Sequence, residues 1–343
     1  MNEQSEMSKS KKKYELSLKE YTQGILSGNR SILSQAITLV ESTLPKHSEL
    51  AQKIINHCLP HTGKSIRVGI TGIPGVGKST FIETFGLYLT EQEKRTVAVL
   101  AIDPTSERSK GSILGDKVRM EKLSVDQNAF IRPSPTSGSL GGVAQSTRET
   151  ILLCEAAGFN TIIVETVGVG QSEIAVDSMV DFFLLLLLAG AGDEIQGMKR
   201  GIMEMADAVA ITKADGENTT RAERARREFE NAIQLFPHKE SGWVPLVTTC
   251  SSLENQGIKE IWETITKHQD LIENSGLLEK KRQEQTKRWM HEAILYGLKK
   301  SFYSNEEINK AVLKLEEKVT EGKKSPFTAA NELLNTYFNK NIS

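Results

Sequence analysis

The spacing of hydrophobic residues divides the chain into three parts. Up to about residue 62, apolar residues recur every three or four positions, which predicts amphipathic helices separated at Gly28-Asn29. From there to about residue 272, short apolar runs alternate with helical patterns, and afterwards only helical spacing remains. We therefore predict an N-terminal helical arm (1–62), a central domain (63–272) and a C-terminal helical region (273–343).

The apolar runs of the central part are short and almost continuous. They are IRVGIT (66–71), TVAVLAI (96–102), TIIVE (161–165), DFFLLLLL (181–188), AVAIT (208–212) and VPLVTT (244–249). Such runs are typical of strands buried on both faces, and their alternation with helices predicts an α/β fold with a mostly parallel sheet. The longest apolar run, 182–189, is far shorter than the roughly 18–20 residues that span a bilayer, so we expect no membrane association.

Composition excludes several classes of protein. Lys and Arg number 43 against 44 Asp and Glu, and this balance argues against a dedicated nucleic-acid-binding protein. Cys58, Cys154 and Cys250 lie far apart without a CxxC pair, which favours reduced, buried thiols in a cytoplasmic protein over disulfides or a zinc site. The N-terminal lysines are followed by no apolar stretch, so we expect no secretory signal.

The most specific motif is a glycine-rich segment, GIPGVGKS at 72–79, which matches G-x-x-x-x-G-K-[ST] between a predicted strand and a predicted helix. Backbone N–H groups of such a loop surround a phosphate, and the helix N-terminus adds a favourable dipole. Lys78 is expected to reach the β- and γ-phosphates. The predicted nucleotide contacts are Gly72, Ile73, Pro74, Gly75, Val76, Gly77, Lys78, Ser79 and Thr80.

Acidic residues at the ends of predicted strands indicate a magnesium site. Asp103 follows TVAVLAI, Glu165 ends TIIVE, and Asp116 lies in the loop GSILGDKVRM. A phosphate-loop enzyme holds Mg²⁺ with a hydroxyl of the loop and a carboxylate at a strand end. The predicted magnesium residues are Ser79, Asp103, Asp116 and Glu165.

The segment after Glu165 has the spacing of a D-x-x-G switch with Glu in place of Asp. Gly168 is then placed to contact the γ-phosphate, and Gln171 is the candidate that positions the attacking water. With Lys78 these are the predicted catalytic residues. Because no other glutamine stands out for this task, we expect slow intrinsic hydrolysis that a partner accelerates.

The sequence T-K-A-D at 212–215 resembles the guanine-reading motif N-K-x-D, with Thr212 in the Asn position. The carboxylate of Asp215 can accept from N1–H and N2–H of guanine, whereas adenine presents an acceptor at N1, so the motif favours GTP over ATP. Lys213 is expected to stack on the base. Loss of the Asn amide is expected to weaken a tether to the phosphate loop. Backbone N–H groups near guanine O6 are expected from Ser251, Ser252 and Leu253.

Eight segments together resemble one known family. They are GIPGVGKST, IDPTS, GSILGDKVRM, SGSLGGVA, CEAAGF, VETVGVGQSE, AGAGDEIQGMKRG and TKAD, in this order. They are similar to the methylmalonyl-CoA mutase-associated GTPases of the MeaB/ArgK type, over about 20–340. In this comparison Thr212 replaces the usual Asn and Ser252 the usual Ala.

The resemblance implies a homodimer through the C-terminal helices. It also implies a GTP-dependent chaperone that gates cofactor loading and protects an adenosylcobalamin-dependent acyl-CoA mutase, by default methylmalonyl-CoA mutase. The loop 189–201 is implied to respond to the nucleotide and signal to the partner, with Asp193, Glu194 and Lys199 as its charged residues.

Two other functions are compatible with a phosphate loop. A nickel-insertion GTPase needs a metal-handling cluster, and only His57, Cys58 and His61 lie close together in the sequence, without C-P-x-C or a His-rich tract. A nucleotide-dependent kinase of a transport-binding protein is the other alternative, but the sequence indicates no dedicated phosphoacceptor pocket.

Overall fold

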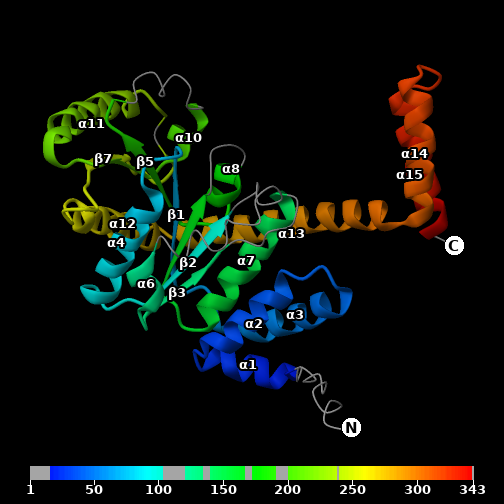
Figure 1. Ribbon diagram of the computed structural model, residues 1–343, viewed down its shortest axis with the longest axis horizontal. Helices are drawn as coiled ribbons and strands as arrows, with labels where there is room; N and C mark the ends of the chain where they lie inside the picture. Colours follow the sequence, from blue (N-terminus) through cyan, green and yellow to red (C-terminus); the bar gives the residue numbers. More distant parts are fainter. Residues whose placement is uncertain are drawn as a thin grey trace, which may run out of the picture. The chain divides into compact units, whose positions relative to one another are not determined.

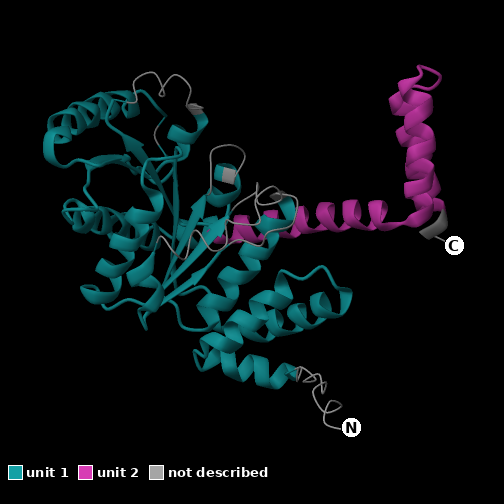
Figure 2. Cartoon of the chain, viewed as in Figure 1, with its two compact units in different colours: residues 1–281 teal, residues 282–343 magenta. Residues whose placement is uncertain are grey.

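The computed structural model describes residues 16–102, 120–133, 140–166, 172–190, 200–237 and 239–341. The chain divides into two compact units, 1–281 and 282–343, which are coloured separately in Figure 2 and are described one at a time below.

A seven-stranded parallel sheet forms the centre of the first unit in the described part of the chain (Figure 1). Its order is β3-β2-β4-β1-β5-β6-β7, and every neighbouring pair is parallel. The predicted α/β class is therefore confirmed. The strands are β1 (Ile66–Gly72), β2 (Val97–Ile102), β3 (Ala129–Arg132), β4 (Thr161–Thr166), β5 (Phe182–Leu188), β6 (Ala208–Thr212) and β7 (Leu246–Thr249).

Six strands coincide with the six apolar runs, but the sequence analysis missed β3. This strand has 4 residues, AFIR, and only Ala129 is buried. It pairs with β2 alone at the edge of the sheet. A short, half-exposed edge strand gives neither a long apolar run nor a clear alternation, and for that reason the pattern did not reveal it.

Helices cover both faces of the sheet. Strand order runs from β1 out to β3 and then back across to β7, so right-handed crossovers place the intervening helices on opposite faces. One face carries α4 (Lys78–Glu91), α6 (Glu121–Val125) and α12 (Ile258–Asn274), and α4 contacts both of the others. The opposite face carries α7 (Leu140–Ala156), α8 (Ser172–Asp177), α10 (Arg200–Met205) and α11 (Thr219–Ile233).

The N-terminal helices pack mainly against α7, and α2 also reaches the edge of the sheet, where Arg132 of β3 forms an ion pair with Glu41. They are α1 (Leu18–Leu26), α2 (Arg30–Val40) and α3 (Pro45–Cys58), followed by the 3-10 turn η1 (Leu59–His61). Ser17 caps α1 in a capping box with Glu20, and Asn29 caps α2, so the break predicted at Gly28-Asn29 is confirmed. The three helices form an additional layer over α7.

The C-terminal part is entirely helical where the structure describes it. Helix α13 (Leu277–Ser304) begins in the first unit and ends in the second, which also contains α14 (Glu306–Thr320) and α15 (Pro326–Asn341). Asn305 caps α14 and Pro326 opens α15. No helix in the described ranges is long and apolar enough to cross a membrane.

Candidate functional site

The predicted nucleotide-binding segments meet at the carboxyl edge of the sheet. Gly72 ends β1, Thr166 ends β4, Thr212 ends β6 and Thr249 ends β7. Because all strands are parallel, these ends lie on the same edge, where α/β sheets bind ligands beside the point at which strand order reverses. Here that point is β1, between β4 and β5.

The phosphate loop is a tight turn between β1 and α4. Gly75 and Gly77 have φ values of 82° and 95°, which residues with a Cβ rarely adopt. A Cβ at Gly72 would lie 2.6 Å from the carbonyl oxygen of Leu186. Gly77 precedes the first turn of α4 and no side chain caps this turn, which leaves its N–H groups for a ligand.

Lys78 has the environment of an anion-binding ammonium group. Its Nζ donates to the carbonyl oxygen of Gly72 at 2.6 Å and lies 3.4 Å from that of Ile73. Burial lowers the pKa of Lys78, and the nearby carboxylates of Glu165 and Glu173 partly oppose this by favouring the charged form. A phosphate at the loop would supply the negative charge that the desolvated ammonium lacks.

Glu173 is a candidate that the sequence analysis missed. This carboxylate lies in the first turn of α8, is fully buried, and is close enough to Lys78 to affect its pKa. The available signal was the second acid of VETVGVGQSE, eight residues after Glu165. Its buried charge on the phosphate side of the sheet was not evident from spacing alone.

Two of the predicted magnesium residues lie in the described ranges, and they fit that ion. Ser79 is half-buried in the first turn of α4, and Glu165 is buried at the end of β4. A hydroxyl and a carboxylate are the hard oxygen ligands that Mg²⁺ prefers. Asp103 and Asp116 lie outside the described residues. Within those residues, no group of three or more His, Cys, Asp or Glu side chains is placed to hold a metal ion.

The T-K-A-D segment is hydrogen-bonded directly to the phosphate loop. The Thr212 hydroxyl lies 2.8 Å from the carbonyl oxygen of Val76 and 3.2 Å from that of Leu187. Lys213 has φ 56° and its ammonium donates to the carbonyl oxygen of Gly75 at 2.9 Å. A tether therefore exists although Thr212 replaces the amide of N-K-x-D.

The loop after β7 closes on the T-K-A-D segment. Ser251 is fully buried, and its hydroxyl donates to Oδ2 of Asp215 at 2.5 Å. Its backbone exchanges two hydrogen bonds of 3.0 Å with Gln256. Gly257 has φ 74°, and a Cβ there would lie 2.2 Å from the carbonyl oxygen of Thr249. Sequence reasoning assigned Ser251 a backbone role and missed this side-chain contact.

The remaining predicted residues are divided between the surface and the ranges not described. Thr80 and Leu253 are exposed at the carboxyl edge, and the carbonyl oxygen of Ser252 accepts from the Thr84 hydroxyl at 3.3 Å. Outside the described residues lie Asp103, Asp116, Gly168, Gln171, Asp193, Glu194 and Lys199.

The nickel alternative depends on three side chains that do not share an environment. Cys58 is buried in the core, whereas His57 and His61 are exposed, and His57 Nδ1 is 2.8 Å from the carbonyl oxygen of Lys53. These residues form no metal site in the part of the chain that the structure describes.

Comparison with known proteins identifies the family. The family model "Methylmalonyl Co-A mutase-associated GTPase MeaB" matches residues 33–307. The chain is 49% identical over 310 residues to a probable GTPase of Mycobacterium tuberculosis (strain ATCC 25618 / H37Rv), covering 90% of this chain and 92% of that protein. It is 46% identical over 296 residues to "GTPase ArgK" of Escherichia coli (strain K12), covering 86% and 89%.

Two further similarities span most of the chain. A protein of Mus musculus called "Methylmalonic aciduria type A homolog, mitochondrial" is 48% identical over 324 residues, covering 92% of this chain and 78% of that protein. The crystal structure titled "LAO/AO transport system kinase" has a TM-score of 0.73 and 38% identity, covering 93% and 97%. The chain therefore belongs to the family of the methylmalonyl Co-A mutase-associated GTPase MeaB, and it is a GTPase.

Proposed function

We propose that this GTPase is a chaperone of an adenosylcobalamin-dependent acyl-CoA mutase, methylmalonyl-CoA mutase in the first instance. In this proposal, GTP binding and hydrolysis gate the loading of the cofactor into the mutase and protect the mutase from inactivation. The description of the family and the name of the mouse relative support the choice of partner. The observation that supports nucleotide control is the hydrogen-bonded connection between the phosphate loop and the base-recognition segment.

We propose a task in hydrolysis for each of these segments. Residues 72–80 would bind the phosphates, with the Lys78 ammonium leaving the Gly72 carbonyl to neutralise charge on the γ-phosphate. Asp215 would pair with N1–H and N2–H of guanine, and the stem of Lys213 would cover the base. Of the predicted residues 251–253, the backbone N–H groups of Ser252 and Leu253 would face O6, because the N–H of Ser251 donates to the carbonyl oxygen of Gln256. We further propose that Gly168 contacts the γ-phosphate and that Gln171 orients the attacking water.

Ser79 and Glu165 would hold Mg²⁺, together with Asp103 and Asp116. When bound, Mg²⁺ supplies positive charge that stabilises the phosphate oxygens during hydrolysis. The protein's own contribution is the half-buried hydroxyl of Ser79 and the buried carboxylate of Glu165, which lies close enough to Lys78 to favour its charged form.

The loop 189–201 is proposed to transmit the state of the nucleotide to the mutase. It follows β5 directly, and β5 lies next to β1 and β6, which carry the phosphate loop and the base-recognition segment. Asp193, Glu194 and Lys199 are the proposed signalling residues. Slow basal hydrolysis and acceleration by the mutase are expected to follow from this arrangement.

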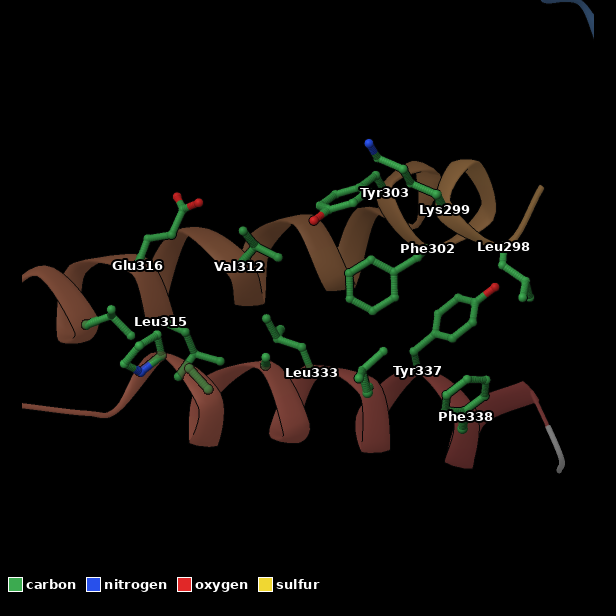
Figure 3. Close-up of a pocket in the computed structure, with 15 residues that line it drawn as sticks. Leu298, Lys299, Phe302, Tyr303, Val312, Leu315, Glu316, Leu333, Tyr337 and Phe338 are labelled. Atoms are coloured by element: carbon green, nitrogen blue, oxygen red, sulfur yellow. The ribbon is translucent and has the colours of Figure 1, made fainter. Parts of the chain in front are cut away.

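A homodimer is proposed through the second unit, which carries an open apolar groove of about 560 Å³ (Figure 3). The groove is lined by the C-terminal end of α13 together with α14 and α15. The ring centroids of Phe302 and Tyr337 lie 5.3 Å apart within it. Leu334 lines the groove and is 43% exposed. Leu334→Asp should shift the protein from dimer to monomer in light scattering. A dimer that persists unchanged would contradict this surface.

The proposed organisation remains a helical arm (1–62), a GTPase domain (63–272) and a C-terminal helical region (273–343). We propose a cytoplasmic location, supported by three buried free cysteines. We expect neither nucleic acid nor a membrane as a partner.

The test is GTP hydrolysis by the purified protein, alone and with the mutase from the same organism, with ATP as the control nucleotide. A slow, GTP-specific rate that the mutase raises would support the proposal. GTP-specific hydrolysis without any response to the mutase would contradict the proposal that the mutase is the partner and would favour a metal-insertion role.

Asp215→Asn provides a matched control for base recognition. An amide in place of the carboxylate can donate to O2 of xanthine. The variant should therefore prefer xanthosine triphosphate, whereas the wild type prefers GTP. A variant that still prefers GTP would contradict the assignment of Asp215.

A kinase reaction is the second candidate, because one similar structure carries a kinase title. Incubation with γ-labelled GTP and a transport-binding protein separates the two functions. Label on the acceptor would favour the kinase, and release of labelled phosphate alone would favour hydrolysis.

A further inference from the structure

We propose that Thr71 and Thr166 are positioning residues that fix the distance between the phosphate loop and the carboxylate of Glu165. Their hydroxyl oxygens lie 2.8 Å apart. Thr71 precedes the last residue of β1, and Thr166 is the last residue of β4. The inference rests on the proposed function in one respect, because it uses the assignment of Glu165 to a Mg²⁺ site.

The hydroxyl pair lies where the backbone ladder between β1 and β4 ends. The last paired residues of these two strands are Ile70 and Glu165. Each strand then continues beside its other neighbour, β1 beside β5 as far as Gly72 and β4 beside β2 as far as Thr166. Beyond the ladder, the hydroxyl pair connects the two strand ends. It does so beside the point of the sheet at which α/β proteins bind ligands.

The pair acts on the backbone rather than on the ligand. Thr71 is 1% exposed and Thr166 is fully buried, so neither hydroxyl is open to a nucleotide. Successive side chains of a strand point to opposite faces of the sheet, so Glu165 points away from the face that carries Thr166. Holding Thr166 in place therefore fixes the backbone from which the Glu165 carboxylate extends.

The phosphate loop begins directly after Thr71. The carbonyl oxygen of Gly72 accepts from Lys78 Nζ at 2.6 Å, and a Cβ at Gly72 would lie 2.6 Å from the carbonyl oxygen of Leu186 in β5. Gly72 is thus closely packed on its β5 side, and Thr71 supplies the connection on its β4 side. Ser79, the proposed partner of Glu165 in holding Mg²⁺, follows in the first turn of α4.

A magnesium site needs this distance to be fixed. Mg²⁺ demands near-ideal octahedral geometry, and here its proposed hydroxyl and carboxylate ligands follow different strands. The two hydroxyl oxygens are held at 2.8 Å, whereas two methyl groups approach one another only to about 3.5–4.0 Å. Replacing both hydroxyls by methyl groups would therefore move the strand ends apart by about 1 Å.

The experiment measures the affinity for a fluorescent GDP analogue as free Mg²⁺ is raised from zero. It gives the affinity without Mg²⁺ and the Mg²⁺ concentration that produces half of the full increase. Thr166→Val removes one hydroxyl with little change in shape, and Thr166→Ser keeps it. Thr71→Val/Thr166→Val removes both hydroxyls and leaves neither unpaired, so its stability should be close to that of the wild type. Thermal unfolding measures the stability of each variant.

Thr161→Val is the matched control. Thr161 is fully buried at the other end of β4, where its hydroxyl accepts from Nε of Arg95 at 2.5 Å. This variant removes a buried hydroxyl from the same strand, far from the phosphate loop, so its half-saturating Mg²⁺ concentration should equal that of the wild type. Glu165→Gln is the positive control, because it removes the charge of the proposed ligand and should raise that concentration most.

Thr166→Val should raise the half-saturating Mg²⁺ concentration by about tenfold, the lower end of what the loss of an outer-shell contact costs. The affinity without Mg²⁺ should not change. The double valine variant should keep the shift although its stability recovers, because the strand ends remain apart. Thr166→Ser should stay within about twofold of the wild type, since it retains the hydrogen bond.

Three results would overturn the inference: an unchanged Mg²⁺ concentration in Thr166→Val, an equal rise in Thr161→Val, or an equal loss of affinity with and without Mg²⁺. Failure of the proposed function gives a different result. A wild-type protein whose GDP affinity does not depend on Mg²⁺, or a Glu165→Gln variant with the wild-type response, overturns the proposed magnesium site instead.

Discussion

The two edges of the central sheet use the same types of charged residue in different ways. At the amino edge, Arg67 and Glu155 form a bidentate ion pair, and Glu155 also accepts from Gly63 N–H and the Ser65 hydroxyl. At the carboxyl edge, the described hydrogen bonds of Lys78 go to backbone carbonyls of its own loop. The first edge pairs opposite charges within the protein, and the second presents a charge to a ligand.

Asp207 extends the arrangement at the amino edge. Its carboxylate accepts from the backbone N–H of Phe183 at 2.8 Å and from Lys239 at 2.5 Å. Burial opposes its ionisation, yet Lys239, Lys281 and His268 together hold the pKa of Asp207 below its usual range. We infer from the difference between the two edges that a buried charged group indicates a ligand site where no oppositely charged side chain of the protein is hydrogen-bonded to it.

The amino edge should show the largest effect on stability. Glu155→Ala removes the bidentate carboxylate from the buried Arg67 guanidinium and should cost about 3–5 kcal/mol of unfolding free energy. Chemical denaturation measures this cost. The double variant Arg67→Met/Glu155→Leu should recover most of the stability. Equal destabilisation of the single and double variants would contradict the ion-pair explanation.

At the carboxyl edge, loss of a charged side chain should reduce activity without reducing stability. Lys78→Met removes the ammonium that neutralises charge on the phosphates, and hydrolysis should fall by about 100-fold or more. Burial lowers the pKa of Lys78, which means that desolvation of the ammonium costs free energy in the free protein, so the thermal midpoint of Lys78→Met should not fall. Single-turnover hydrolysis and calorimetry test the two statements. A clear loss of stability in Lys78→Met would contradict the proposed difference between the two edges of the sheet.

Asp207→Asn sharpens the comparison through its pH dependence. The lowered pKa of Asp207 means that its charge stabilises the fold above the unfolded pKa of about 3.9, and that this contribution is lost as pH falls through the folded pKa. The variant should lose about 2 kcal/mol at neutral pH. The gap to the wild type should shrink in denaturation curves at acid pH, and a constant gap would show that charge is not responsible.

The smallest expected effect concerns Lys78 and alkaline pH. Its pKa is lowered in the free protein, mainly by burial, and bound phosphates should raise it again, so nucleotide binding takes up a proton. GDP affinity should therefore be full below the lowered pKa and fall by a few-fold as pH rises through it. Lys78→Arg, which stays charged, is the control and also corrects for ionisation of guanine. Parallel pH profiles for both proteins would contradict the assignment.

The sequence predicted those features that depend on neighbours along the chain. The six apolar runs, the break at Gly28-Asn29 and the glycine pattern of 72–79 are local signals, and the structure has strands, a helix start and a tight loop at these places. The expected parallel sheet followed from their alternation. The edge strand β3 was missed because its burial is partial.

Contacts between distant segments were not predictable in the same way. Nothing in the spacing places the Ser251 hydroxyl on Asp215, 36 residues away, or Glu155 on Arg67, 88 residues away. The hydrogen bond from Thr212 to Val76 joins residues 136 apart. The sequence-based expectation of a weakened tether considered only the missing Asn amide and not the Thr212 hydroxyl. These pairs depend on strand order and on which face each helix covers.

The start of α13 has a practical consequence for preparing shorter forms of the protein. The Lys281 ammonium donates to the carbonyl oxygen of Asp181 at 2.9 Å, and Lys280 pairs with Glu240 at 2.7 Å. Lys281 also helps to keep Asp207 ionised. A chain cut after residue 272 would lose these cations and leave the buried carboxylate undercompensated. A chain cut after residue 281 keeps them, and is the one to express for crystals of the GTPase part alone.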